Sequence, residues 1–450
     1  MEVQMAKKFV FIGAGSLDFT RELIRDILTF EAFEDAELHL VDIDPKRLMY
    51  ARKGVERIVQ ACGNHAKIFS TTERTEALSG ADGVLITILQ GGVEVWRTDI
   101  EIPKKYGVDT CVGDTRSASG IFRFLRTAPV LLDIIRDCEK YCPQAIVLNY
   151  TNPMAMLVNF LQQSSTINVT GLCHSVQGTA MMLAEWLGKD DKDIDYTCVG
   201  INHQAFYTKF TDKAGNDLYP ALRKALEDPE IYNQEIIRND MFRHLDYYTT
   251  ESSGHVSEYN WWYRKRPELI VEYTTGGTGW NAGEYGFILH EYLERETTWE
   301  AEYQDWLENG ELELEKGDEY ASNIFNAVFG DHTPFPFNGN LRNQGLVTNI
   351  VEGACVEVPV LADQTGIHPV GVNSLPDHLA ILVNLSAGIE DLVVKAVIEK
   401  NPKLVMRAIM MDPLSSAVLS LAEIRKMVKE MFAANKQYLT YFEAVDIDNL

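Results

Sequence analysis

The chain has 450 residues, and its 66 acidic against 41 basic side chains give a formal net charge of −25. A surface this acidic repels the phosphates of nucleic acids and of anionic lipids, so neither is an expected partner. No run approaches the ~18 apolar residues of a membrane-spanning helix, and the apolar N-terminal run enters a glycine turn without a signal-peptide cleavage site. The seven scattered cysteines favour free thiols, and hence a cytoplasmic protein.

The first half of the chain alternates strands with helices. The patterns predict strands at 8–12, 37–41, 83–89, 145–150, 169–173 and 195–201, and helices at 19–30 and 45–62. Strands that alternate with helices are typical of a parallel sheet covered on both faces. We therefore expect an α/β fold whose residues 1–204 form a Rossmann-like, doubly wound parallel sheet.

A glycine turn follows the first predicted strand. Gly13, Gly15 and Ser16 lie between this strand and a helix, where glycines let a pyrophosphate approach the backbone and helix amides bind it. Asp42 ends the second strand, as expected for a carboxylate that binds the ribose hydroxyls of NAD and repels the 2′-phosphate of NADP. The usual third glycine is replaced by Asp18. The pattern predicts NAD binding.

Three polar segments follow later strands of the same region, at 149–153, 171–175 and 200–204. Ligands of open parallel sheets bind beyond the carboxyl ends of the strands, so all three segments should face the cofactor crevice. A cysteine thiolate and a histidine from separate segments could hold a divalent ion. The spacing alone fits packed or capping side chains as well, because the sequence has neither a CxxC pair nor an HExxH helix.

The second half has a different pattern. Residues 232–303 are rich in aromatic and charged side chains, residues 280–317 predict an acidic surface helix, and residues 356–361 predict a strand. Long amphipathic helices are expected over 375–432, with a break near Asp412 and Pro413. We expect residues 205–450 to form an α+β lobe for substrate binding and oligomerisation, in a homodimer or homotetramer.

Eight stretches, in the same order along the chain, resemble glycoside hydrolase family 4, the NAD- and metal-dependent glycosidases. The resemblance extends over essentially the whole length of the chain, and the branch that the stretches resemble most is the melibiase-type α-galactosidases. These stretches are residues 11–16, 42–45, 149–156, 171–179 (GLCHSVQGT), 200–207 (GINHQAFY), 250–259 (TESSGHVSEY), 338–349 and 410–413.

The resemblance assigns roles to individual residues. Cys173 and His203 match the two protein ligands of the family's metal, usually Mn2+, although Co2+, Ni2+ or Fe2+ would also suit such a site. Asn152 matches the substrate-binding asparagine. His174 stands where phospho-glycosidases have Asp or Asn, which implies an unphosphorylated sugar, and it could act as an acid or as a sugar contact.

Two segments depart from the family pattern. The catalytic tyrosine of many members matches His255, with Tyr259 four residues later, so either side chain could be the general base. The loop at 113–120 resembles DTxGPGG elsewhere but carries Arg116 here, and this cation could bind a carboxylated sugar. A surface arginine in a flexible loop fits the sequence equally well.

The resemblance implies hydrolysis through transient oxidation. NAD removes hydride from C3 of the sugar, the metal stabilises the enediolate formed on C2 deprotonation, the leaving group departs, and the hydride returns. Glu251 and Glu258 are expected to be solvated or to bind substrate, not to form the carboxylate pair of ordinary glycosidases. Three alternatives remain: an α-galacturonidase, α-glucuronidase or α-glucosidase of the same family, an NAD-dependent hydroxy-acid dehydrogenase, and a non-catalytic NAD-binding regulator.

Overall fold

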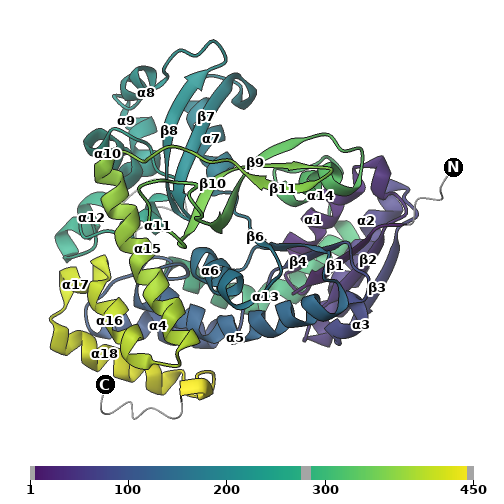
Figure 1. Ribbon diagram of the computed structural model, residues 1–450, viewed down its shortest axis with the longest axis horizontal. Helices are drawn as coiled ribbons and strands as arrows, with labels where there is room; N and C mark the ends of the chain where they lie inside the picture. Colours follow the sequence, from purple (N-terminus) through teal and green to yellow (C-terminus); the bar gives the residue numbers. More distant parts are fainter. Residues whose placement is uncertain (1–5, 275–284, 443–450) are drawn as a thin grey trace.

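The computed structural model describes residues 6–274 and 285–442 and has one mixed sheet (Figure 1). Six strands are parallel and lie in the order β3-β2-β1-β4-β5-β6, which is the strand order of dinucleotide-binding sheets. Their bounds are β1 (Lys8–Ile12), β2 (Glu37–Val41), β3 (Lys67–Thr71), β4 (Gly83–Ile86), β5 (Ile146–Asn149) and β6 (Val169–Gly171). The predicted Rossmann-like α/β fold is confirmed.

Antiparallel strands extend the sheet beyond β6, in the order β9-β10-β7-β8, with β11 paired to β10. They are β7 (Ile194–Ile201), β8 (Gln204–Asp212), β9 (Phe335–Arg342), β10 (Cys355–Asp363) and β11 (Gly366–Pro369). Residues from the second half of the chain thus lie between two strands of the first half. The predicted boundary between residues 204 and 205 falls within the β7–β8 hairpin of this sheet, and the division into two domains stays a prediction.

Helices cover both faces of the parallel strands (Figure 1). Along β1, Phe9 and Phe11 pack into one apolar cluster, with α1 and α2, while Val10 and Ile12 pack into another, with α5 and α6. Both side-chain sets of the strand are therefore buried, as expected for a sheet covered on two sides. In this half the helices are α1 (Leu17–Leu28), α2 (Pro45–Cys62), α3 (Arg74–Leu78), α4 (Gly92–Lys105), α5 (Ser117–Tyr141), α6 (Met154–Ser164) and α7 (Ser175–Trp186).

The second half is mainly helical and is joined to the first by the shared sheet. Its helices are α8 (Tyr219–Ala225), α9 (Pro229–Tyr232), α10 (Ile236–Leu245), α11 (Ser253–Glu258), α12 (Pro267–Thr274), α13 (Phe287–Asn309), α14 (Tyr320–Phe329), α15 (Asp377–Ile398), α16 (Pro402–Met411), α17 (Pro413–Val418) and α18 (Leu421–Ala434). Within residues 6–274 and 285–442, no helix combines the length and apolar character needed to span a bilayer.

Most predicted elements are present, with shifted ends. The predicted helix at 280–317 is α13 over a shorter range, and residues 280–284 lie outside the described residues. The break at Asp412 is confirmed, because its side chain accepts a hydrogen bond from the Ser415 amide and caps α17. The sequence patterns missed β3, β8, β9 and β11, which are either half polar or close to the turns of hairpins.

Candidate functional site

The glycine turn after β1 has a geometry that only glycine allows. Gly13 has a φ of +92°, and a Cβ there would lie 2.3 Å from the carbonyl oxygen of Thr87 at the end of β4. A Cβ on Gly15 would lie 2.6 Å from the Asp42 Oδ2 atom. The turn therefore brings the backbone close to the ends of β2 and β4, where a dinucleotide crosses a sheet of this topology.

The turn also offers the donors and acceptors that NAD requires. Ser16 precedes α1, and its side chain makes no capping hydrogen bond. The Ser16 hydroxyl therefore does not compete with a phosphate for the first amides of the helix. Asp42 accepts hydrogen bonds from the Gly15 amide at 2.7 Å and the Asp44 amide at 2.9 Å. A carboxylate has about four acceptor positions, so Asp42 can still bind ribose hydroxyls. The four predicted cofactor residues lie together and fit NAD.

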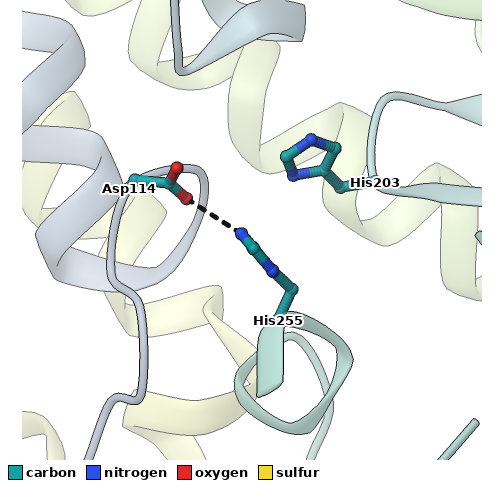
Figure 2. A group of neighbouring side chains, drawn as sticks. All are labelled: Asp114, His203 and His255. Atoms are coloured by element: carbon teal, nitrogen blue, oxygen red, sulfur yellow. Dashed lines mark ion pairs between the residues drawn. The ribbon is translucent and has the colours of Figure 1, made fainter. Parts of the chain in front are cut away.

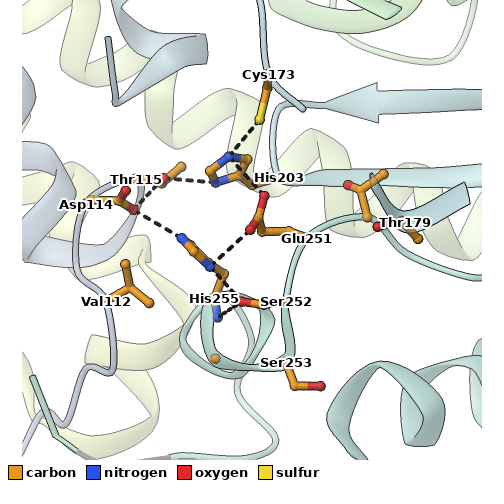
Figure 3. Close-up of polar contacts among 12 residues, drawn as sticks. Val112, Asp114, Thr115, Cys173, Thr179, His203, Glu251, Ser252, Ser253 and His255 are labelled. Atoms are coloured by element: carbon orange, nitrogen blue, oxygen red, sulfur yellow. Dashed lines mark hydrogen bonds and ion pairs between the residues drawn. The ribbon is translucent and has the colours of Figure 1, made fainter. Parts of the chain in front are cut away.

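A thiol, an imidazole and a carboxylate meet near the end of β6 (Figure 3). Cys173 follows β6, His203 lies in the turn between β7 and β8, and Glu251 precedes α11. The His203 Nε2 atom is 3.3 Å from the Cys173 Sγ atom and 3.2 Å from the Glu251 Oε2 atom. The two predicted metal ligands are thus neighbours, and Glu251 is a third candidate that the sequence did not assign to the metal.

These three atoms suit a divalent ion. Ligand bonds of about 2.0–2.3 Å place neighbouring ligand atoms roughly 3–3.6 Å apart, which matches the observed separations. Burial, followed by the charges of Glu251 and Glu357, raises the pKa of the Cys173 thiol well above its usual value. A cation is what would favour its thiolate here. Burial lowers the pKa of His203 to about 4, although the Glu251 charge opposes this shift, so His203 is neutral and able to coordinate.

A chain of hydrogen bonds fixes which nitrogen of His203 faces the cluster (Figure 3). The Thr115 Oγ1 hydroxyl donates to the Asp114 Oδ1 atom at 2.8 Å and lies 3.1 Å from the His203 Nδ1 atom. Because the hydroxyl proton is used, Nδ1 donates to Thr115 and Nε2 keeps its lone pair. The Tyr259 hydroxyl is also 3.3 Å from Nδ1. This orientation presents Nε2 to Cys173 and Glu251.

The backbone is strained at two of the three candidate ligands. His203 has a φ of +63° and Glu251 a φ of +71°, in the left-handed region that non-glycine residues rarely adopt. The Thr250 amide donates to the Ala205 carbonyl at 2.9 Å and so ties the Glu251 segment to β8, directly after the His203 turn. Strain of this kind collects at functional sites, where surrounding contacts hold it.

His255 lies between the carboxylates of Asp114 and Glu251 (Figure 3), and Figure 2 shows its imidazole directed toward Asp114. Its Nε2 atom is 3.6 Å from the Asp114 Oδ1 atom, and its Nδ1 atom is 3.2 Å from the Glu251 Oε1 atom. The Ser252 hydroxyl is 2.8 Å from the same Nδ1 atom. Burial opposes the charged form, but the carboxylates of Glu251 and Asp114 outweigh it and raise the pKa of His255 to about 9. The imidazole can therefore carry a proton at neutral pH.

Two other predicted residues, His174 and Asn152, follow β6 and β5. The side chain of His174 is 72% exposed, and its Nδ1 atom lies 3.4 Å from the Glu319 Oε1 atom, whose hydrogen bond raises the pKa of His174. Asn152 follows β5, and its side-chain oxygen accepts a hydrogen bond from the Met154 amide. Both lie at the carboxyl edge of the parallel strands, and their catalytic and substrate-binding roles stay predictions.

Arg116 is buried, unlike a surface arginine in a flexible loop. Its Nε atom donates to the Glu390 Oε1 atom at 3.1 Å, and its Nη2 atom donates to the Asn202 carbonyl at 2.6 Å. Its guanidinium lies 4.7 Å from the centre of the Tyr259 ring. The charge is compensated by Glu390, and the contact with Asn202 anchors the residue next to His203. A contact between Arg116 and substrate stays a prediction.

Replacing Arg116 with methionine is expected to lower the free energy of unfolding by about 3–5 kcal/mol, because Glu390 would keep a buried charge without its partner. The change is measured as a lower Tm and a lower urea midpoint. The double variant Arg116→Met/Glu390→Met serves as the control, and most of the lost stability should return in it. Equal losses in the single and double variants would contradict this account of the pair.

Sequence reasoning missed several residues of the site and misplaced one. Asp114 and Thr115 orient the histidines from a loop in which only Arg116 stood out. Glu258 was expected to be solvated or to bind substrate, but it is fully buried. Its carboxylate accepts three hydrogen bonds from the amides of residues 111–113 and so holds that loop in place. Glu251 could have been found from the sequence, because it lies four residues before His255 in the stretch 250–259 that resembles the family.

Comparison with known proteins agrees with these observations. The model "Family 4 glycosyl hydrolase" matches residues 8–189, and "Family 4 glycosyl hydrolase C-terminal domain" matches residues 198–415. An α-galactosidase of Rhizobium meliloti is 37% identical, over 98% of this chain and 90% of its own. An α-galactosidase of Bacillus subtilis is also 37% identical, over 97% and 100%.

A solved structure shows the same fold. It is a 6-phospho-α-glucosidase from gut microorganisms in complex with NAD and Mn2+, with a TM-score of 0.81, 19% identity, and coverage of 96% of this chain and 99% of its own. The two family models together cover most of the chain, which excludes the dehydrogenase and the non-catalytic regulator. The chain is a glycosidase and belongs to family 4 of the glycosyl hydrolases.

Proposed function

We propose that this enzyme hydrolyses α-galactosides with bound NAD and a divalent metal, Mn2+ foremost, in the cytoplasm. The observation that carries the proposal is the convergence of Cys173, His203 and Glu251 at the edge of the sheet that also bears the glycine turn. The two α-galactosidases at 37% identity support the choice of sugar. Assembly as a homodimer or homotetramer belongs to the same proposal.

Different residues would bind the dinucleotide and the metal ion. Gly13, Gly15 and Ser16 would bind the pyrophosphate, and Asp42 the ribose, while Cys173, His203 and Glu251 would hold the ion. When bound, the nicotinamide supplies hydride acceptance at C3 of the sugar, and the ion supplies Lewis-acid stabilisation of charge beside the resulting carbonyl. These groups explain why a glycosidase can work without a pair of carboxylates across the glycosidic bond.

Proton transfer at C2 would be the task of His255 and Tyr259. His255 holds a proton between Asp114 and Glu251, and its two nitrogens are oriented by these carboxylates. The Tyr259 hydroxyl lies 3.3 Å from the His203 Nδ1 atom, and burial raises the pKa of Tyr259 well above its usual value. Acceptance of the C2 proton requires the unprotonated form of the base. His255 would reach this form at the lower pH of the two, because its pKa is about 9 while the pKa of Tyr259 is raised well above its usual value.

Substrate contacts would come from Asn152 and from the exposed His174, which could protonate the leaving group. Because Arg116 is paired with Glu390, its charge is compensated, and we expect a galacturonide to be a poorer substrate than a galactoside. The α-glucoside and α-glucuronide are also expected to be poorer, because the supporting relatives are α-galactosidases.

A panel of nitrophenyl glycosides tests the proposal. The α-galactoside should be cleaved fastest, and activity should fall at least about 100-fold when NAD, Mn2+ or reductant is omitted. A substrate carrying deuterium at C2 should lose label to water during turnover. Full activity of dinucleotide-free enzyme, or complete retention of the C2 label, would refute the mechanism, whereas faster cleavage of the galacturonide would refute only the sugar assignment.

A further inference from the structure

Helix α13 packs on two helices of the dinucleotide half, α4 and α2. At its N-terminal end Ile288 and Leu289 pack with Trp96 and Ile100 of α4 in one buried cluster. At its C-terminal end α13 packs on α2, with Tyr303 beside Tyr50 at 6.1 Å between ring centres. Since α2 follows β2 and α4 follows β4, α13 packs on the helices that come directly after these two strands, and Asp42 lies between β2 and α2.

The two cations at the start of α2 are held by carboxylates of α13. The Arg47 Nη2 atom lies 2.9 Å from the Glu296 Oε1 atom, and the Lys46 Nζ atom lies 2.5 Å from the Glu300 Oε2 atom. The Arg47 guanidinium also stacks over the Trp299 ring, 4.4 Å from its centre. Both cations are therefore directed toward α13.

Arg47 also contacts the glycine turn. Its Nη1 atom donates to the Gly15 carbonyl at 3.4 Å, while the Gly15 amide donates to the Asp42 Oδ2 atom at 2.7 Å. Together with the ion pair between Arg47 and Glu296, these make three contacts that connect Glu296 of α13 to the carboxylate expected to bind the ribose. Arg47 is within reach of the ribose end of the site, but its charge is already paired.

We propose that Glu296 and Glu300 help this enzyme select NAD over NADP, by neutralising Arg47 and Lys46 beside the ribose position. The inference rests on the proposed function, in which the glycine turn and Asp42 bind the dinucleotide. Sites that accept a 2′-phosphate usually place an arginine near it. Here Arg47 is present, but Glu296 of α13 pairs with its charge. The carboxylates of Glu296 and Glu300 would also repel a phosphate.

The test compares the affinities of NADPH and NADH, measured by nicotinamide fluorescence on the full-length enzyme. The ratio Kd(NADPH)/Kd(NADH) is expected to fall about tenfold in the variant Glu296→Gln/Glu300→Gln, with NADH affinity changed less than about twofold. The matched control is Glu294→Gln/Glu302→Gln, which removes the same charge from exposed positions of the same helix. This control should leave the ratio unchanged.

A second pair of variants assigns the gain to the arginine. Glu296→Gln is made with and without Arg47→Ala, and the gain in NADPH affinity should appear only where Arg47 is present. Circular dichroism and Tm verify that α13 stays folded in each variant.

The inference is overturned if the ratio is unchanged in Glu296→Gln/Glu300→Gln, if the control lowers it equally, or if the gain persists without Arg47. In each of these cases the proposed function is unaffected as long as the parent enzyme binds NADH. A parent enzyme that binds neither NADH nor NADPH would remove both the proposed function and the inference.

Discussion

Replacing Cys173 with serine is expected to remove metal binding and to lower kcat/KM for an α-galactoside by about 1,000-fold or more. The Cys173 Sγ atom lies 3.3 Å from the His203 Nε2 atom. Together with Glu251, these two residues form the group of three candidate metal ligands. A serine hydroxyl stays protonated and neutral, so it is a much poorer ligand for a divalent cation than an anionic thiolate. Bound Mn2+ is counted by electron paramagnetic resonance, and activity is measured at saturating NAD.

The matched control for this experiment is Cys62→Ser, because Cys62 is also a free, half-buried thiol but ends α2 and lies outside the cluster. It should keep full metal binding and activity. NAD affinity should survive in Cys173→Ser, since the glycine turn is separate from β6. A Cys173→Ser enzyme that retains stoichiometric Mn2+ and normal turnover would remove this cysteine from the ligand set.

Replacing Glu251 with glutamine is expected to weaken Mn2+ binding about 10- to 100-fold and to lower kcat by about 100-fold even at saturating metal. Glu251 has two contacts, because its Oε2 atom lies 3.2 Å from the His203 Nε2 atom and its Oε1 atom 3.2 Å from the His255 Nδ1 atom. Loss of its charge would therefore affect the metal ligands and the proton carrier together. Metal titrations and steady-state kinetics separate the two effects.

The titration of His255 provides a further readout of the same variant. Burial disfavours the imidazolium, and the Glu251 charge is the largest contribution that raises the pKa of His255 to about 9. Without that charge the folded-state pKa must fall, so the imidazolium is lost at lower pH than in the parent enzyme. The pKa is followed by NMR of the imidazole in the metal-free protein. Glu272→Gln, an exposed change near the end of α12, should alter none of these quantities.

The dinucleotide turn could be predicted because its requirements are local. Gly13 and Gly15 stand directly after a short apolar strand, and their need for glycine follows from the close approach of the next strands. Asp42 ends a second strand that begins a predictable distance later. The alternation of strands and helices predicted a parallel, doubly wound sheet, but the strand order came from the structure, since β3 was missed in the sequence.

The metal cluster could be predicted only in part. Cys173 and His203 belong to stretches that resemble the family and that follow strands. Asp114, Thr115 and Glu251 lie in loops, where no periodicity indicates which side chain points inward. Their places depend on contacts from other elements, such as the carboxylate of Glu258 at the end of α11, which holds residues 111–113.

By itself, the sequence determined the α/β class, the nucleotide turn and the family, because these depend on residues close together in the chain and on the order of motifs. Tertiary structure alone decided that strands 335–363 enter the sheet between β6 and β7, that Arg116 is buried against Glu390, and that α13 reaches Arg47. These contacts join residues more than 150 positions apart. Their partners are chosen by burial, charge and shape in the folded molecule, and no local pattern records that choice.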